Sequence, residues 1–172
     1  MQLRTRIALV FALSAAACTT SGPTRVVEAD PAHRAELLGA VTALQGRWVM
    51  HAPEGDAFTE FQVTANGTAV RETMFPGTPH EMTNMYVLDG NVLEMTHYCA
   101  GGNQPRMSAD ALVDGRLEFR PVTVGDLKSA DEPYMGAMTL VLIDADHIEQ
   151  RWVAYNQTSD EHSPVFTLER VK

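Results

Sequence analysis

The sequence is poor in cysteine, and it contains no long hydrophobic run. Its two cysteines are Cys18 and Cys99. If the Cys18 thiol is modified in some way other than disulfide formation, Cys99 has no partner. No disulfide within the chain can then stabilise the fold. The apolar residues, 45% of the 172, must then supply the stability through one buried core.

Basic residues are also scarce. The chain has 13 lysines and arginines against 22 aspartates and glutamates, which gives a formal net charge of −9 at pH 7. Such a surface repels nucleic-acid phosphates, and no stripe of basic residues offsets it, so no nucleic-acid partner is expected. The excess of acidic residues is explained by solubility, because a net charge keeps a protein in solution.

Motifs of the common catalytic and cofactor sites are missing as well. There is no Gly-x-Ser-x-Gly, no phosphate-binding loop and no dinucleotide fingerprint. No pair of histidines has the spacing of a tetrahedral metal site. The histidines expected on turns and outer positions are His51, His80, His147 and His162. We therefore expect no metal, no cofactor and no catalytic residue, and hence no enzyme.

A recognisable segment begins the chain. Arg4 and Arg6 precede a short apolar stretch, residues 7–13, and four small residues, 14–17, lead into Cys18. This is the layout of a secretory signal, and the apolar stretch is too short to span a bilayer.

The end of this segment, Ala15-Ala16-Ala17-Cys18, resembles the lipobox of bacterial lipoproteins, although Leu is more usual in place of Ala15. The resemblance implies that residues 1–17 are removed and that Cys18 then carries acyl chains, such as palmitate, which anchor the protein to a membrane. Cleavage after Ala17 by the ordinary signal peptidase is the alternative.

Residues 18–29 are polar and suit a flexible tether between the lipid and a single folded domain over residues 30–172. Thr19 stands where a sorting rule of bacterial lipoproteins places Asp in proteins of the inner membrane. By that resemblance, the expected location is the periplasmic face of the outer membrane, in the cell envelope.

One helix is expected at the start of the folded domain. Asp30 is a suitable N-cap, Pro31 is tolerated at the first helical position, and Gly46 is a stop. Four apolar residues between them recur at helical spacing: Leu37, Leu38, Val41 and Leu44. The pattern predicts an amphipathic helix over residues 31–45.

After Gly46 the apolar pattern changes to short runs with a period of two. Turn sequences such as Asn66-Gly67 and Asp114-Gly115 separate these runs and favour tight hairpins. The runs predict strands at residues 46–52, 57–64, 67–75, 81–88, 91–99, 105–113, 115–122, 136–144, 146–155 and 161–171. Hairpin-connected strands form an up-and-down sheet, and closure removes its edges. We expect an all-β, closed antiparallel barrel of about eight to ten strands, with the helix across one end.

Alternation also predicts which side chains face the lumen, because charged residues mark the outer face of several strands. The apolar residues expected inside include Trp48, Met50, Phe61, Val63, Val70, Met74, Leu93, Met95, Met107, Leu117, Phe119, Ile148 and Trp152. Glu72, His97 and Gln150 are the polar residues expected among them. Such a mixture is typical of a small-ligand site, and equally of a filled barrel whose polar groups are satisfied.

The sequence Gly46-Arg47-Trp48 after a helix, with Arg170 on the last strand, resembles the calycin superfamily, the lipocalins and their relatives. The resemblance implies that Arg170 packs on Trp48 and closes one barrel end by a cation–π contact. The strand count is closer to nitrobindin-like and fatty-acid-binding barrels than to eight-stranded lipocalins. A second stretch, His97-Tyr98-Cys99 through Gly102 to Met107, resembles uncharacterised bacterial proteins and implies no activity.

The predicted function is that of a lipid-anchored envelope protein that binds a small, partly apolar ligand in its lumen, without catalysis. The candidate ligand-binding residues are Glu72, His97, Cys99, Gln150 and Trp152. The Gly-rich residues 100–105 are expected to form a rim beside them. A Cys99 nucleophile is not expected, because neighbours on one strand rarely reach hydrogen-bond distance.

Three alternatives stay open. The first is a filled barrel that serves structure or protein interaction. The second is an acid–base enzyme that uses His97 and Glu72. The third is a haem protein with His97 as axial ligand, by resemblance to nitrobindin-like barrels.

Replacement of the cysteine at the lipobox tests the anchor. We expect Cys18→Ser to accumulate as an uncleaved or soluble precursor, because a serine hydroxyl does not replace the thiol in lipid attachment. Cell fractionation and the mass of the N-terminal peptide check this, with Cys99→Ser as the control that stays in the membrane fraction. A Cys18→Ser protein that is processed and fractionates with membranes as before would contradict the lipoprotein assignment.

Overall fold

The computed structural model describes residues 29–156 and 163–172. The expected signal segment 1–17, the anchor Cys18, Thr19 and most of the expected tether lie outside these ranges, and so does His162. No helix within the described ranges is long and apolar enough to cross a membrane.

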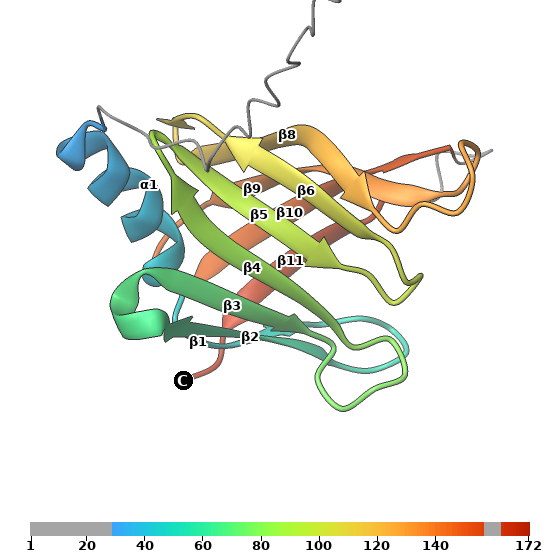
Figure 1. Cartoon of the computed structure of the whole chain (residues 1–172). Helices are drawn as coiled ribbons and strands as arrows, with labels where there is room; N and C mark the ends of the chain where they lie inside the picture. The colour runs from blue at the N-terminus through green and yellow to red at the C-terminus, as the bar shows by residue number, and fades with distance from the viewer. Residues whose placement is uncertain (1–28, 157–162) are drawn as a thin grey trace, which may run out of the picture.

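The described chain forms one α-helix, one short 3₁₀ turn and eleven strands (Figure 1). The helix α1 spans Pro31–Thr42 and the 3₁₀ turn η1 spans Ala65–Gly67. The strands are β1 (Gly46–Met50), β2 (Ala57–Thr64), β3 (Ala69–Met74), β4 (Met82–Asp89), β5 (Val92–Tyr98), β6 (Gln104–Ala109), β7 (Leu112–Val113), β8 (Arg116–Gly125), β9 (Tyr134–Leu142), β10 (His147–Tyr155) and β11 (Val165–Arg170).

Two expected elements differ from the structure. The helix expected over 31–45 ends at Thr42, and the chain then turns into β1. The single strand expected over 105–113 is two strands, β6 and β7, because the chain bends at Asp110 and Ala111. The bend lets β8 pair with β6 along one part of its length and with β7 along another.

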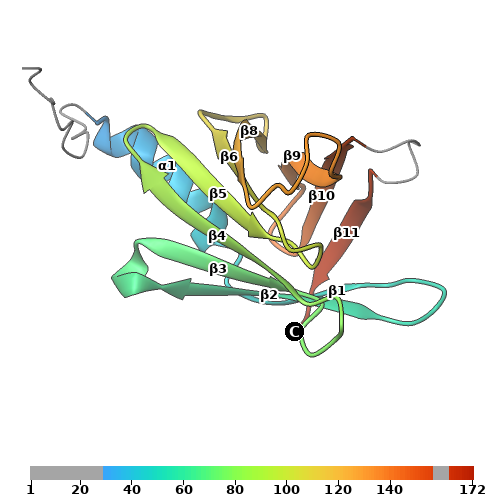
Figure 2. The same cartoon turned by 45° about the vertical axis from the view of Figure 1, so that its right-hand side comes forward.

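All strand pairs are antiparallel, and the first and last strands, β1 and β11, pair with each other. Pairing of β6 with β8 completes a ring of ten strands, outside which β7 pairs with β8. The closed antiparallel barrel with one N-terminal helix is the architecture that the sequence predicted. Figure 2 shows the ring with α1 behind it.

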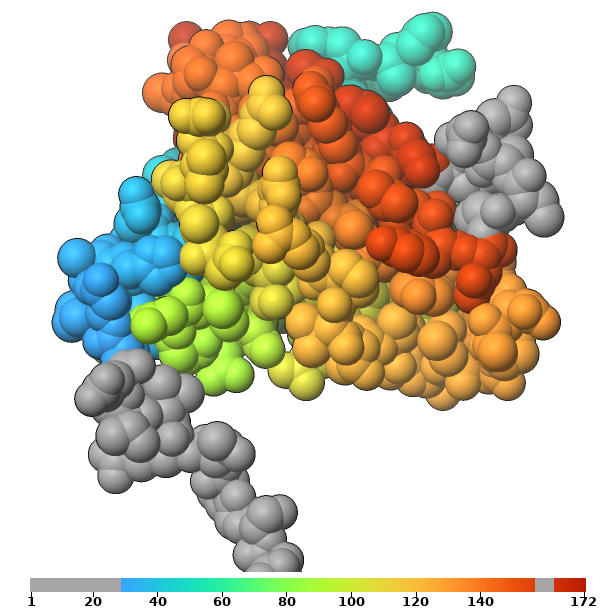
Figure 3. Space-filling view, turned by 90° about the horizontal axis from the view of Figure 1, so that it is seen from above, coloured from blue at the N-terminus to red at the C-terminus, as the bar shows by residue number. Residues whose placement is uncertain are grey.

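The two ends of the barrel differ (Figure 1). At the helix end, α1 lies across the opening. At the loop end lie the connections after β1, β3, β5 and β8, which are residues 51–56, 75–81, 99–103 and 126–133. Viewed from above, the chain from β6 to β10 covers the upper face, and α1 lies at one side of that face (Figure 3).

The start of α1 is fixed by hydrogen bonds. Asp30 Oδ1 accepts from the backbone N–H of Ala32 at 2.9 Å and of His33 at 3.3 Å, which is the expected N-cap. The backbone N–H of Asp30 donates to Asn91 Oδ1 at 2.8 Å and so attaches the helix to the β4–β5 turn. The buried face of the helix then packs on the barrel core.

Arg170 closes the helix end. Its Cζ lies 4.3 Å from the centroid of the Trp48 ring. Its Nη1 donates to the carbonyl of Gln45 at 2.9 Å and its Nη2 to the carbonyl of Ala43 at 3.0 Å. Trp48 Nε1 donates to the carbonyl of Leu44 at 2.8 Å. The pair thus joins the last strand, the first strand and residues 43–45, which follow α1 and whose carbonyls have no partner within the helix.

We expect Arg170→Lys to lower the free energy of unfolding by about 1–3 kcal/mol, because a lysine cannot cover the indole and reach two carbonyls with a planar fork. Arg151, an exposed β10 residue bonded to Glu149, provides the matched control. Its Lys variant should change stability by less than about 0.5 kcal/mol. Urea unfolding measures both, and equal effects would show that the Arg170 geometry contributes nothing.

Candidate functional site

A row of polar side chains crosses three neighbouring strands inside the barrel. Glu72 on β3 pairs with Asn84 on β4, and Asn84 pairs with His97 on β5. Side chains of directly opposed residues project from the same face, with Cβ atoms about 4.5–5.5 Å apart. All three residues are buried. Strand register therefore assembles a polar cluster in an otherwise apolar lumen.

Glu72 accepts three hydrogen bonds at the centre of this cluster. Its Oε2 accepts from Asn84 Nδ2 at 2.7 Å and from the Tyr86 hydroxyl at 2.6 Å, and its Oε1 accepts from Gln150 Nε2 at 2.7 Å. Because Gln150 lies on β10, the carboxyl group links two parts of the barrel wall across the lumen. Burial raises the pKa of Glu72, and the three donors counteract it by favouring the carboxylate.

These bonds also determine the tautomer of His97. Asn84 directs its Nδ2 at Glu72, so its Oδ1 faces His97 Nδ1 at 2.7 Å. An amide oxygen is only an acceptor, so Nδ1 carries the proton and Nε2 carries a lone pair. Nε2 is buried and has no hydrogen-bond partner among the described residues. Burial also lowers the pKa of His97 from 6.5 to about 4, so the ring is neutral at pH 7.

The remaining predicted site residues divide into two groups. Trp152 lies with its ring centroid 4.8 Å from that of His97, and its Nε1 donates to Gln150 Oε1 at 3.4 Å. Trp152 and Gln150 therefore both belong to the polar cluster. Cys99 is half-buried, and its Sγ accepts from the backbone N–H of Gly101 at 3.4 Å. Its thiol is therefore part of the β5–β6 loop, and within the described residues it makes no hydrogen bond to His97.

Three members of the site were not predicted. Asn84 and Tyr86 lie on β4, whose one charged residue, Asp89, is at its very end, so no charge in the middle of the strand marks the outer face. Asn103 lies in the Gly-rich segment between β5 and β6 and is also buried. Its Nδ2 donates to Glu132 Oε1 and to the carbonyl of Pro133, both at 3.0 Å. Its Oδ1, like His97 Nε2, has no partner among the described residues.

Methionines surround the loop-end part of the core. Met50 ends β1, Met74 ends β3, Met82 begins β4 and Met135 is the second residue of β9, so all four lie where their strands approach the loop end. Met74 is buried, and the other three are half-buried against the core. Met74 also touches the polar cluster, since its Sδ lies 3.4 Å from Asn84 Nδ2. Methionine side chains are flexible and adapt to irregular shapes.

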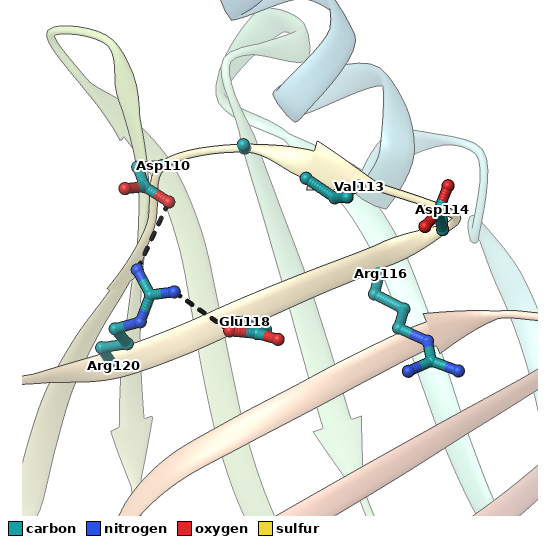
Figure 4. Close-up of a pocket in the computed structure, with 7 residues that line it drawn as sticks. Asp110, Val113, Asp114, Arg116, Glu118 and Arg120 are labelled. Atoms are coloured by element: carbon teal, nitrogen blue, oxygen red, sulfur yellow. Dashed lines mark hydrogen bonds and ion pairs between the residues drawn. The ribbon is translucent and has the colours of Figure 1, made fainter.

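A surface groove of about 410 Å³ lies outside the lumen, over β7 and the start of β8 (Figure 4). Arg120 lies 3.6 Å from Asp110 and 3.0 Å from Glu118 there, and both carboxylates are exposed. Exposed pairs of this kind contribute little energy. The groove shares no residue with the polar cluster, and we assign no function to it.

The chain matches no known protein-family model and none of the curated proteins with which it was compared. Among the described residues, no group of three or more His, Cys, Asp and Glu side chains could hold a metal ion.

Two of the alternatives fit the geometry poorly. An acid–base pair requires two groups that converge on one substrate, but Asn84 lies between His97 and Glu72, and both Glu72 oxygens already accept hydrogen bonds. A haem is a large rigid plane that would have to lie against His97 Nε2, yet the His97 ring packs on Trp152 and buried core side chains surround it. The residues present therefore do not fit a haem, and we derive no chemistry through one.

The lowered pKa of His97 predicts a pH-dependent stability. Unfolded histidine gains a proton as the pH falls below 6.5, whereas folded His97 stays neutral down to about pH 4. The contribution of His97 to the free energy of unfolding is thus fully present above pH 6.5. It decreases as the pH falls toward 4, by up to about 1.4 kcal/mol per pH unit.

Glu72 acts in the opposite direction, because its raised pKa lets the folded protein hold a proton just above pH 4.5, where the unfolded glutamate has already lost it. Comparison with His97→Gln isolates the histidine, since Glu72 is present in both proteins and glutamine keeps an N–H for Asn84. Urea unfolding between pH 4 and 6.5 should show a steeper loss of stability for the wild type. Parallel curves would mean that His97 is not neutral in the folded protein.

Proposed function

We propose that the barrel binds a small, partly apolar molecule at its loop end, and that a lipid on Cys18 anchors the protein to the periplasmic face of the outer membrane. The observation that carries the binding proposal is the buried, unpartnered Nε2 of His97. A buried acceptor without a donor costs about 1–3 kcal/mol. A ligand that donates a hydrogen bond to Nε2 recovers that free energy.

The other polar groups of the cluster support His97 and do not address a ligand. The Glu72 and Gln150 side chains spend their hydrogen-bonding capacity on each other and on protein partners. They hold Asn84, and Asn84 holds the His97 ring in one tautomer. A single oriented acceptor beside an aromatic wall, Trp152, is what a mostly apolar ligand site requires.

Access to His97 runs through the loop end. The helix end is closed by α1 and by the contact between Arg170 and Trp48. At the loop end, the half-buried Met50, Met82 and Met135 pack on the core, and methionine side chains can move without a change in strand pairing. A ligand therefore reaches Nε2 by displacing methionine side chains, which remain as apolar contacts around it.

Native mass spectrometry of the full-length protein, purified in mild detergent, tests this function. We expect a bound small molecule in the wild type and its loss in His97→Phe, which keeps an aromatic ring and removes the acceptor. His147→Phe is the matched control, because His147 is exposed and lies at the opposite end of its strand from Trp152. This variant should retain the molecule.

Thermal unfolding provides the second measurement. Removal of the bound molecule should lower the melting temperature of the wild type, because a ligand that binds only the folded state stabilises it. His97→Phe should show no such dependence. A wild type without any bound molecule, and with a melting temperature that extraction leaves unchanged, would instead identify a filled barrel.

A further inference from the structure

We propose that the molecule bound at the loop end is a small organic cation that carries N–H donors, an alkylammonium compound, and that carboxylates such as fatty acids are excluded. The inference rests on the proposed function and names the ligand class of the same site. Two observations support it: two buried hydrogen-bond acceptors have no donor, and carboxylates are connected to both of them through hydrogen bonds.

Both unpartnered buried side-chain atoms of the described residues are acceptors. One is His97 Nε2, and the other is Asn103 Oδ1. The identity of Oδ1 follows from Nδ2, which already donates to two oxygens, Glu132 Oε1 and the Pro133 carbonyl. A site with two free acceptors and no free donor requires a ligand that donates.

The register of β5 and β6 brings the two residues that carry these acceptors to the same end of the barrel. Thr96 pairs with Arg106, and the backbone N–H of Cys99 donates to the carbonyl of Asn103 at 3.2 Å, so the β5–β6 pairing continues past His97. His97 and Asn103 are then diagonal neighbours, with Cα atoms roughly 7–8 Å apart. One ammonium nitrogen can donate to two acceptors as far apart as about 6 Å.

A carboxylate stands behind each acceptor. Glu72 binds Asn84, which in turn accepts from His97, and Glu132 accepts directly from Asn103. Both chains of hydrogen bonds place negative charge on the side away from the free lone pair. Polarisation of this kind strengthens an acceptor toward a cation.

Burial raises the pKa of Glu72, but the hydrogen-bond pattern around it is that of a carboxylate. A proton on Oε1 would oppose the Gln150 N–H group, and the Gln150 amide cannot turn because its Oε1 accepts from Trp152. A proton on Oε2 would leave the Tyr86 hydroxyl without an acceptor among its described contacts. The carboxylate form satisfies every donor that points at it.

No arginine or lysine is buried among the described residues, so the interior offers no partner to an anion. Lys128 of the β8–β9 loop is exposed: its ammonium lies beside Gly102, next to Asn103, and 4.0 Å from the carboxylate of Asp126. A carboxylate ligand would therefore lose its hydration beside Glu72 without compensation, whereas a cation would be attracted by it.

Three probes of equal chain length separate the charge types. Butylammonium, butanol and butyrate are titrated into the full-length protein at pH 7 and constant ionic strength, with affinity measured by calorimetry. We expect butylammonium to bind at least tenfold more tightly than either of the others. In His97→Phe this preference should fall below threefold.

Glu132→Gln gives a test that does not disturb the core, because Glu132 is on the β8–β9 loop. Glutamine keeps an oxygen for Asn103 and gives up the oxygen that accepts from the backbone N–H of Lys128. We expect the affinity for butylammonium to fall two- to fivefold and that for butanol to stay unchanged. A merely structural role for Glu132 would change both alike. Lys128→Gln is the matched loop control and should not weaken butylammonium binding.

Butyrate or butanol binding as tightly as butylammonium would overturn the charge preference while leaving the binding function intact. The same conclusion follows if the molecule that copurifies is an anion or has no N–H donor, and a copurifying amine supports the inference. If no probe binds and nothing copurifies, both the inference and the proposed function fail.

Discussion

A buried carboxylate without a basic partner organises the interior of this barrel. Taking Glu72 out of water is tolerated because three donors from two other strands surround it. Each donor is then no longer free to point elsewhere. The Asn84 amide can face only one way, and that orientation leaves His97 with a single tautomer. Tyr86 and Gln150 are held in the same manner, so one unfavourable burial defines the geometry of the whole cluster.

Much of the architecture is predictable from the sequence, because it depends on local rules. Asp30 and Pro31 predict the helix start, and Asn-Gly and Asp-Gly turns with period-two runs predict the hairpins. Arginine and glutamate on the outer face of β8 and β10 identify the inner residues of those strands. The contact of Arg170 with Trp48 was expected from a family resemblance and not from spacing, and the structure places the guanidinium over the ring.

The unpredicted parts depend on contacts between distant segments. The corner between β6 and β7 arises because β8 pairs with both, which no periodicity in residues 105–113 reports. Met107 pairs with Pro121, where the ladder is irregular, as is usual for a proline within a sheet. Asn103 is buried by a loop that lies almost thirty residues farther along the chain, and Glu132 and Pro133 of that loop are its partners. Sequence reasoning placed His97 inside but could not show that one of its nitrogens is free.

The concentration of methionine at one end has a chemical consequence besides adaptability. Thioethers are oxidised to sulfoxides, which are polar and chiral. The half-buried Met50, Met82 and Met135 are all at the loop end, whereas Trp48 in the helix-end closure contacts Arg170, Phe61 and the Leu44 carbonyl. Oxidative damage in the envelope would therefore act on one end of the barrel first. It would make the approach to His97 hydrophilic while the strand ladder and the Arg170 closure stay intact, so the protein would lose its apolar lining before it lost its fold.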